Sequence, residues 1–131
     1  MHGVGKVRGN KKISRFAQQW ANYLNDNSKF GHRPKASQKY GENLSWMSGN
    51  VNGADHVNNL YTAEEQFYRD YNYYGIEPPM VNFTHYGHFT QIVWKGSKKI
   101  GVGVAGPVVV INYDPAGNYI GQFKDNVFDK P

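Results

Sequence analysis

The chain has no cysteine among its 131 residues, and this absence removes several kinds of stabilisation and chemistry at once. Disulfides are excluded, and so are thiolate nucleophiles and zinc sites built on cysteine. A chain of this length can bury a hydrophobic core without such cross-links, so we expect one domain over residues 1–131. A disulfide-free domain suits a reducing compartment. A core of this size is also stable without disulfides outside the cell, so the lack of cysteine does not decide the compartment.

Long hydrophobic runs are also missing. No apolar stretch approaches the ~20 residues that a transmembrane helix needs. The segment Met1–Asn10 is polar and rich in glycine, and it lacks the pattern of a signal peptide. Removal of a leader before Met1 would leave the same sequence, so secretion and residence on a cytosolic membrane face both stay open.

Acidic residues are fewer than basic ones, with 10 Asp and Glu against 15 Lys and Arg and a net charge of +5. For any one basic cluster an ordinary mixed-charge surface is the simpler interpretation. Together the clusters predict weak attraction to an anionic membrane. A nucleic acid is not expected as a partner, because the sequence contains no nucleic-acid-binding module and its lysines are scattered. The clusters are Lys6–Arg8, Lys11–Lys12, Arg33–Lys39 and Lys95–Lys99.

Hydrophobic periodicity predicts two helices. The first covers Lys12–Asn27, with Asn10 as its N-cap and polar side chains on its outer face. The second starts after Gly53 and includes the tyrosine-rich run to Tyr74, where Gly75 and the two prolines that follow would end it. Apolar residues recur at helical spacing in the first helix at Ile13, Phe16, Ala17, Trp20 and Leu24. In the second helix they recur at Val57, Leu60, Tyr61, Phe67, Tyr68 and Tyr71. Glu64 lies on the same side of the second helix as these residues.

Two β-branched segments, Ile100–Ala105 and Val108–Tyr113, predict an antiparallel hairpin around Gly106-Pro107. The pattern G-x-G-x-x-G at Gly101–Gly106 lies inside the first of these strands. It lacks the following helix that a dinucleotide site requires, so we interpret its glycines as places where another element packs closely on the sheet. Helices combined with a small antiparallel sheet give an α+β fold class.

Histidine and carboxylate side chains are the candidates for site chemistry. His32 and Glu42 lie ten residues apart in polar segments, and His88 precedes an apolar one. Such groups suit a divalent metal or acid–base chemistry, but their spacing alone favours ordinary surface residues. His85 and His88 would share a metal only if their segment were helical. No serine has a context that would activate it as a nucleophile, whether Ser45, Ser48 or Ser97.

The aromatic run 67–74 has two interpretations. Its rings can form the buried face of the second helix, with the excess exposed. They can also form the wall of a crevice for a flat apolar ligand. We predict such a crevice between this helix and the loop 75–87, bordered by Tyr71, Tyr74 and Met80 and separate from the histidines.

Four segments, in this order, resemble one family. Phe16–Ala21 (FAQQWA) and Tyr40–Leu44 (YGENL) are followed by Gly87–Trp94 (GHFTQIVW) and Ile111–Tyr119 (INYDPAGNY). They are similar to the signatures of the CAP superfamily, which unites cysteine-rich secretory proteins, antigen 5 and pathogenesis-related proteins. The match spans nearly the whole chain.

The resemblance implies an α-β-α sandwich with a three-stranded antiparallel sheet, and a cleft that holds two histidines and two acids. By position the histidines are His32 and His88, which we predict as zinc ligands, and the first acid is Glu42. Phe67–Asp70 matches the family's W-Y-x-E pattern best, so Asp70 is the predicted second acid and Glu64 is the alternative. Both acids would orient the histidines or hold a water rather than bind the metal.

The cysteine-free pattern most resembles the Golgi-associated members, and parts of it resemble the fungal sterol-exporting ones. The start Met1-His2-Gly3 lacks a myristoylation motif. His2-Gly3-Val4 resembles the end of the family's first helix, so that helix is expected to be absent and the domain truncated. The resemblance implies a protein that binds lipid or sterol, and the basic charge adds anionic membrane as a ligand. Because no nucleophile is identifiable, we expect no enzymatic activity, and no cofactor is required. A secreted protein acting through a protein partner is the alternative, a metal-dependent hydrolase is less favoured, and a homodimer is left open.

Overall fold

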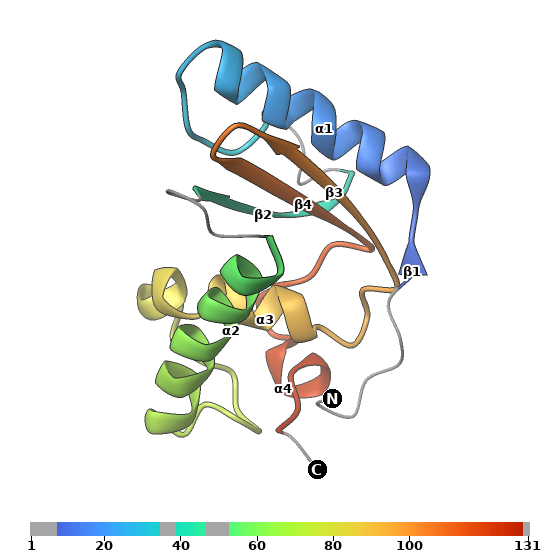
Figure 1. Ribbon diagram of the computed structural model, residues 1–131. Helices are drawn as coiled ribbons and strands as arrows, with labels where there is room; N and C mark the ends of the chain where they lie inside the picture. Colours follow the sequence, from blue (N-terminus) through green and yellow to red (C-terminus); the bar gives the residue numbers. More distant parts are fainter. Residues whose placement is uncertain (1–7, 35–38, 47–52, 130–131) are drawn as a thin grey trace.

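The computed structural model describes residues 8–34, 39–46 and 53–129, which place one β-sheet between two helical layers (Figure 1). The strand order is β1-β3-β4-β2. β2, β3 and β4 pair antiparallel, and β1 adds two residues parallel to β3 at one edge. The expected sandwich with three antiparallel strands is therefore confirmed. The strands are β1 (Arg8–Gly9), β2 (Gly41–Trp46), β3 (Lys99–Ala105) and β4 (Val108–Asp114).

The helix α1, Lys11–Asp26, forms one layer by itself. The side chain of Asn10 accepts a hydrogen bond from the N–H of Ile13 at 3.1 Å, which satisfies one of the free donors at the helix start. The buried residues Ile13, Ala17, Ala21 and Leu24 form a stripe that packs on the sheet. The predicted helix and its cap are confirmed.

Two glycines let α1 lie directly on β3. A Cβ atom at Gly101 would fall on the backbone at Ile13 and Ser14, and one at Gly103 would fall on the backbone at Ala17 and Gln18. The helix axis can therefore approach the strand more closely than any side chain would allow. This confirms that the glycine pattern serves packing.

The helix α2, Gly53–Asp70, ends four residues before the predicted boundary. Asn72 adopts a left-handed conformation with φ 57°. Its N–H donates to the carbonyl of Arg69 and the N–H of Tyr73 donates to the carbonyl of Tyr68, each at 3.0 Å. This is a Schellman motif with asparagine in the usual place of glycine, so the prediction that the helix continues to Tyr74 is wrong.

The second layer also contains the 3₁₀ helix η2 (Met80–His85), α3 (Gly87–Val93) and α4 (Phe123–Asn126). Its core is aromatic, because Tyr68, Tyr86 and Phe89 are fully buried together. Phe123 of α4 is also buried, with its ring 5.1 Å from that of Trp94. The loop predicted over 75–87 therefore contains a 3₁₀ helix.

Several sequence features lie outside the described residues. These are residues 1–4, on which the expectations about the first helix and the myristoylation motif rest, and Ser48. Within the described ranges, no helix combines the length and the apolar character that crossing a bilayer requires.

Candidate functional site

The first half of the site joins the loop after α1 to the start of β2. The side chain of His32 is 70% exposed, and that of Glu42 is only 5% exposed. His32 Nδ1 lies 2.8 Å from Glu42 Oε1. The same oxygen accepts the backbone N–H of Arg33 at 3.1 Å, so the buried carboxylate holds the loop and orients the exposed imidazole.

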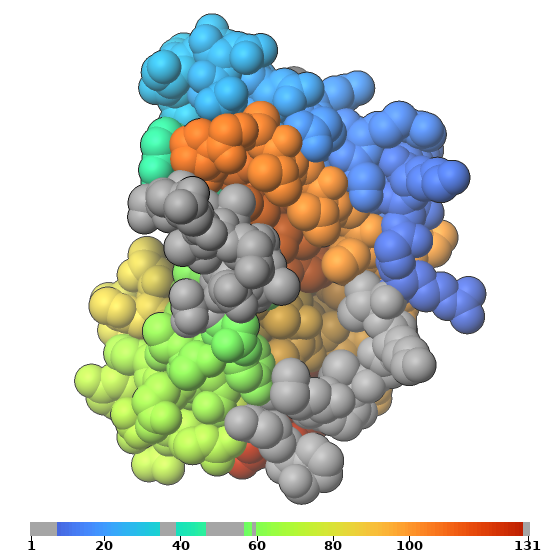
Figure 2. All heavy atoms as spheres, in the orientation of Figure 1, coloured from blue at the N-terminus to red at the C-terminus, as the bar shows by residue number. Residues whose placement is uncertain are grey.

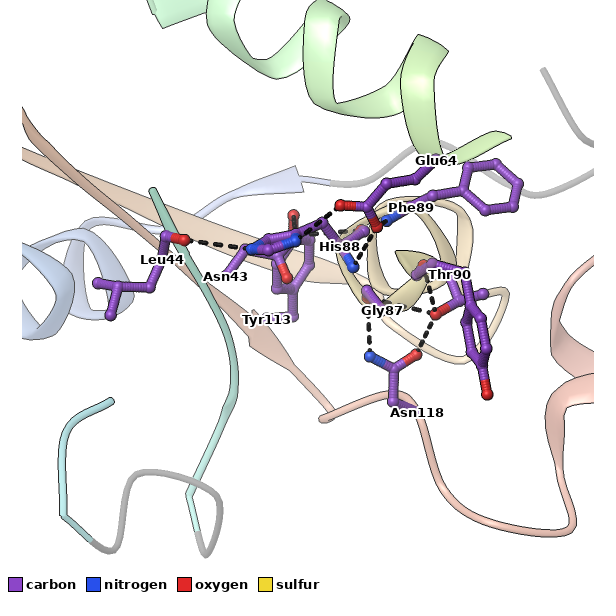
Figure 3. Close-up of polar contacts among 10 residues, drawn as sticks. Asn43, Leu44, Glu64, Gly87, His88, Phe89, Thr90, Tyr113 and Asn118 are labelled. Carbon is purple, nitrogen blue, oxygen red and sulfur yellow. Dashed lines mark hydrogen bonds and ion pairs between the residues drawn. The ribbon is translucent and has the colours of Figure 1, made fainter. Parts of the chain in front are cut away.

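The second half joins α2 to the start of α3 (Figure 3). Glu64 Oε1 accepts the backbone N–H groups of His88 at 2.9 Å and of Phe89 at 3.1 Å. Glu64 Oε2 lies 2.9 Å from His88 Nδ1. One carboxylate therefore caps α3, where N–H groups have no helical partner, and also fixes the ring of its histidine.

The other ring nitrogen of His88 is also engaged. Nε2 lies 3.1 Å from the carbonyl oxygen of Leu44 on β2, so the ring is held between two oxygen acceptors. The pKa of His88 is raised above its ordinary value, chiefly by the hydrogen bond to Glu64, with burial acting in the opposite direction. The protonated ring can donate to both oxygens, which a neutral imidazole cannot do.

The predicted second acid, Asp70, does not lie in the cleft. It is the last residue of α2, it is exposed, and it accepts a hydrogen bond from Gln66 Nε2 at 2.7 Å. Six residues separate it from Glu64, which corresponds to about 9 Å along the helix and about 240° around it. Glu64, the alternative acid, has the position beside His88, so Asp70 is replaced by Glu64.

His32, Glu42 and His88 line one cavity of about 200 Å³, together with Asn43, Phe83 and Asn118. His32 and Glu42 also line a larger adjacent cavity of about 450 Å³. Nowhere in the described ranges do three His, Asp or Glu side chains come close enough to form a ready metal cluster. The geometry is thus two histidine–carboxylate pairs across a cleft.

His85 does not join His88 as a chelating pair. It ends η2, and its ring stacks on Phe67 with a centroid distance of 4.9 Å. α3 begins only after Tyr86, so the two histidines do not share one continuous helix.

Polar side chains that the sequence did not single out hold α3 in place. Asn43 Nδ2 donates to the carbonyl of His88 at 3.2 Å. Asn118 donates to the carbonyl of Gly87 at 2.9 Å and accepts from the hydroxyl of Thr90 at 2.6 Å (Figure 3). These residues fall within the matched segments, so the signature had marked them, although not their role in positioning His88.

The three residues of the predicted crevice have different surroundings. Tyr71 is 58% exposed, whereas the hydroxyl of Tyr74 donates to the buried carboxylate of Glu65 at 2.6 Å. Met80 Sδ lies 3.7 Å from the hydroxyl of Tyr86. None of the three lines either of the two cavities at the cleft, and a ligand crevice among them stays a prediction.

Comparison with known proteins gives a consistent picture. Residues 1–107 match the family model of CAP, the cysteine-rich secretory protein family. Golgi-associated plant pathogenesis-related protein 1 of Homo sapiens is 36% identical over 96% of this chain and 82% of its own length. Pathogenesis-related protein 1 of Arabidopsis thaliana is 32% identical over 92% of this chain and 71% of its own length.

Solved structures share the fold. BmVAL-1 superposes with a TM-score of 0.62 at 24% identity, over 87% of this chain and 61% of that one. NaASP2, solved with Zn²⁺, gives a TM-score of 0.62 at 22% identity, over 99% of this chain and 69% of that one. Residues 1–107 match the family model, and a relative is 36% identical over 96% of this chain, so the chain belongs to the CAP family.

Proposed function

We propose that this protein is a non-enzymatic CAP module whose cleft binds a divalent metal ion, zinc in the first place, through His32 and His88. The observation that carries the proposal is that two histidines line one cavity and each has a carboxylate at Nδ1. Metal-binding histidines commonly have such a carboxylate on the nitrogen that does not face the metal. The related fold of NaASP2, solved with Zn²⁺, supports the choice of metal.

The two histidines fit a metal ion unequally. His32 is exposed and its Nε2 has no hydrogen-bond partner in the described part of the chain, so this nitrogen is free to bind. His88 must first give up its contact with the carbonyl of Leu44. Imidazole nitrogens suit zinc, but two of them make an open site, so the affinity should be modest and should increase with pH as the rings become neutral.

The test is calorimetric titration of zinc into the full chain and into variants. His32→Ala with His88→Ala should abolish the binding, and His85→Ala serves as the matched control because His85 lies outside the cleft. Equal zinc binding by the double variant and the parent would overturn the assignment. Zinc-dependent turnover of a peptide library that Glu42→Gln abolishes would overturn the non-enzymatic part.

Association with anionic membranes is a second candidate function, favoured by how charge is divided along the chain. Residues 1–41 contain nine Lys and Arg and one acid, a net charge of +8, and residues 42–131 carry a net charge of −3. The helix α1 belongs to the basic part and forms its own layer, opposite α2 (Figure 2). A basic group near an anionic lipid surface contributes about 1 kcal/mol to binding.

Sedimentation with vesicles tests this second function. The chain should bind phosphatidylserine-containing vesicles and not pure phosphatidylcholine vesicles, and added salt should weaken the binding. Equal binding to both kinds of vesicle would contradict it.

A further inference from the structure

A separate cavity of about 230 Å³ lies between α1 and the residues that precede β2. Lys12, Arg15, Phe16 and Gln19 line it from α1, and Lys39 and Tyr40 line it from the other side. Positions 12, 15, 16 and 19 share one face of a helix. Three cationic side chains therefore converge on one cavity, which we call the basic pocket.

Aromatic rings lie beside one cation of the basic pocket, Lys39, and beside the neighbouring Arg33. Phe16 and Tyr40 meet edge to face with centroids 4.9 Å apart. Lys39 Nζ lies 5.2 Å from the ring centre of Phe16 and 5.8 Å from that of Tyr40. The guanidinium of Arg33 lies 3.9 Å over the ring of Phe16 and donates to the carbonyl of Phe16 at 3.0 Å. Ring faces attract cations, so positive charge is concentrated around Phe16.

This positive charge lacks compensation from acids. The sequence contains no Asp or Glu before Asp26 and none between Asp26 and Glu42. In the part of the chain that the structure describes, the ion pairs involve other side chains, so Lys12, Arg15 and Lys39 have no carboxylate partner. Lys12 and Arg15 also lie near the N-terminus of α1, whose first turn has no acid, and cations there oppose the helix dipole.

We propose that the basic pocket binds a phosphomonoester group. Lys12, Lys39 and the planar guanidinium of Arg15 supply charged donors, and the amide of Gln19 supplies a neutral one. A doubly charged phosphate offsets the repulsion among the three cations better than a singly charged carboxylate does. The aromatic side of the pocket gives the carbon skeleton that bears the phosphate a surface to pack on.

The phosphate can belong to a lipid headgroup or to a free small molecule, and both present the same chemistry to the pocket. The lipid source rests on the membrane association proposed above, whereas binding of a free phosphate does not. The two sources are therefore distinguished by separate arms of one experiment.

The first arm titrates inorganic phosphate into ¹⁵N-labelled protein, with sodium chloride at equal ionic strength as reference. The second compares vesicles of phosphatidylcholine containing phosphatidic acid, a phosphomonoester, with vesicles containing phosphatidylserine at matched zeta potential. Both arms use the parent, a pocket variant (Lys12→Gln with Lys39→Gln) and a control that loses the same charge elsewhere (Lys98→Gln with Lys124→Gln). Lys12, Lys39, Lys98 and Lys124 are all exposed, so these variants should fold.

Phosphate should shift the amide signals of Lys12–Gln19 and of Lys39–Tyr40, and the pocket variant should bind it at least about tenfold more weakly while the control matches the parent. Preference for phosphatidic acid that disappears only in the pocket variant supports a lipid headgroup. Phosphate binding without that preference supports a free phosphate ligand. Equal losses in the pocket variant and the control would overturn the site, because binding would then depend only on total charge. Failure to bind any anionic vesicle would refute the membrane function alone.

Discussion

Glu64→Gln should uncouple two roles that one carboxylate performs. In the parent, Glu64 caps α3 through the N–H groups of His88 and Phe89, and its second oxygen faces His88 Nδ1. Glutamine keeps a carbonyl oxygen for the backbone groups but presents an amide to the imidazole. Two charge-assisted hydrogen bonds become neutral ones, and the carboxylate at the helix start is lost.

The expected cost is about 2 kcal/mol in the free energy of unfolding. A hydrogen bond to a charged group contributes about 1.5–3 kcal/mol and a neutral one about 1 kcal/mol. The Glu64 side chain is only 12% exposed, so solvent screens little of this difference. Urea unfolding of metal-free protein measures it.

The cost should also depend on pH. The folded-state pKa of His88 is raised above 6.5, mainly by Glu64, so protonation of His88 stabilises the folded state. That stabilisation is complete below pH 6.5 and is lost as pH rises through the raised pKa. The stability difference between parent and Glu64→Gln should therefore be largest on the acid side and shrink towards alkaline pH.

NMR titration of the His88 ring should show a lower pKa in Glu64→Gln than in the parent. Asp70→Asn is the matched control, since it removes an exposed carboxylate from the same helix, and it should change stability by less than about 0.5 kcal/mol and leave the pKa of His88 unchanged. An unaltered His88 pKa in Glu64→Gln, or the full effect in Asp70→Asn, would refute this account of the cleft.

Three further predictions concern packing, positioning and ligand binding. Gly103→Ala should destabilise the protein by about 2–3 kcal/mol in urea unfolding, because its Cβ meets the backbone of α1, whereas Gly9→Ala, whose Cβ has open space, should stay within about 0.5 kcal/mol. Asn118→Gly keeps the positive φ of 60° but removes the hydrogen bonds to Gly87 and Thr90, so it should cost about 1–3 kcal/mol and speed amide exchange in α3. If the predicted crevice exists, Tyr71→Ala should weaken binding of a fluorescent sterol, whereas the control Tyr23→Ala, at an exposed tyrosine of α1, should not. Equal sterol binding by Tyr71→Ala and the parent would mean that these rings only form surface and core.

The sequence best predicted the structural elements that are determined by residues close together in the chain. The apolar stripe and the cap at Asn10 defined α1, and the β-branched segments around Gly106 defined the hairpin β3–β4. The end of α2 was predicted too late because Asn72 takes the left-handed position that glycine usually occupies. The tyrosines on both sides of Asn72 continue the aromatic pattern of the helix, so the sequence shows no break there. The contact of His88 with Leu44 joins residues 44 apart in sequence, and no local pattern contains it.

Glu64 was predicted only as the alternative to Asp70, and this ranking has a different cause. Helical periodicity had placed Glu64 on the same side as Tyr61 and Tyr68, and the structure confirms that this side faces α3, since Tyr61 packs against Phe89 at 5.6 Å. A carboxylate within an apolar stripe was therefore a usable signal. The match of Phe67–Asp70 to a family pattern overrode it, although an acid six residues further along lies on another side of the helix.

The position of Glu64 also bears on how the cleft works. Asn43, Asn118 and Glu64 all bind the first turn of α3, so its start is fixed from the sheet, from the loop after β4 and from α2. The ring of His88 is therefore fixed with both nitrogens in contact with oxygen atoms, whereas His32 is exposed and its Nε2 has no hydrogen-bond partner in the described residues. A metal ion that enters the cleft would meet His32 first and reach His88 only by displacing the carbonyl of Leu44. The cost of that exchange should keep zinc binding modest even though both histidines are already oriented by their carboxylates.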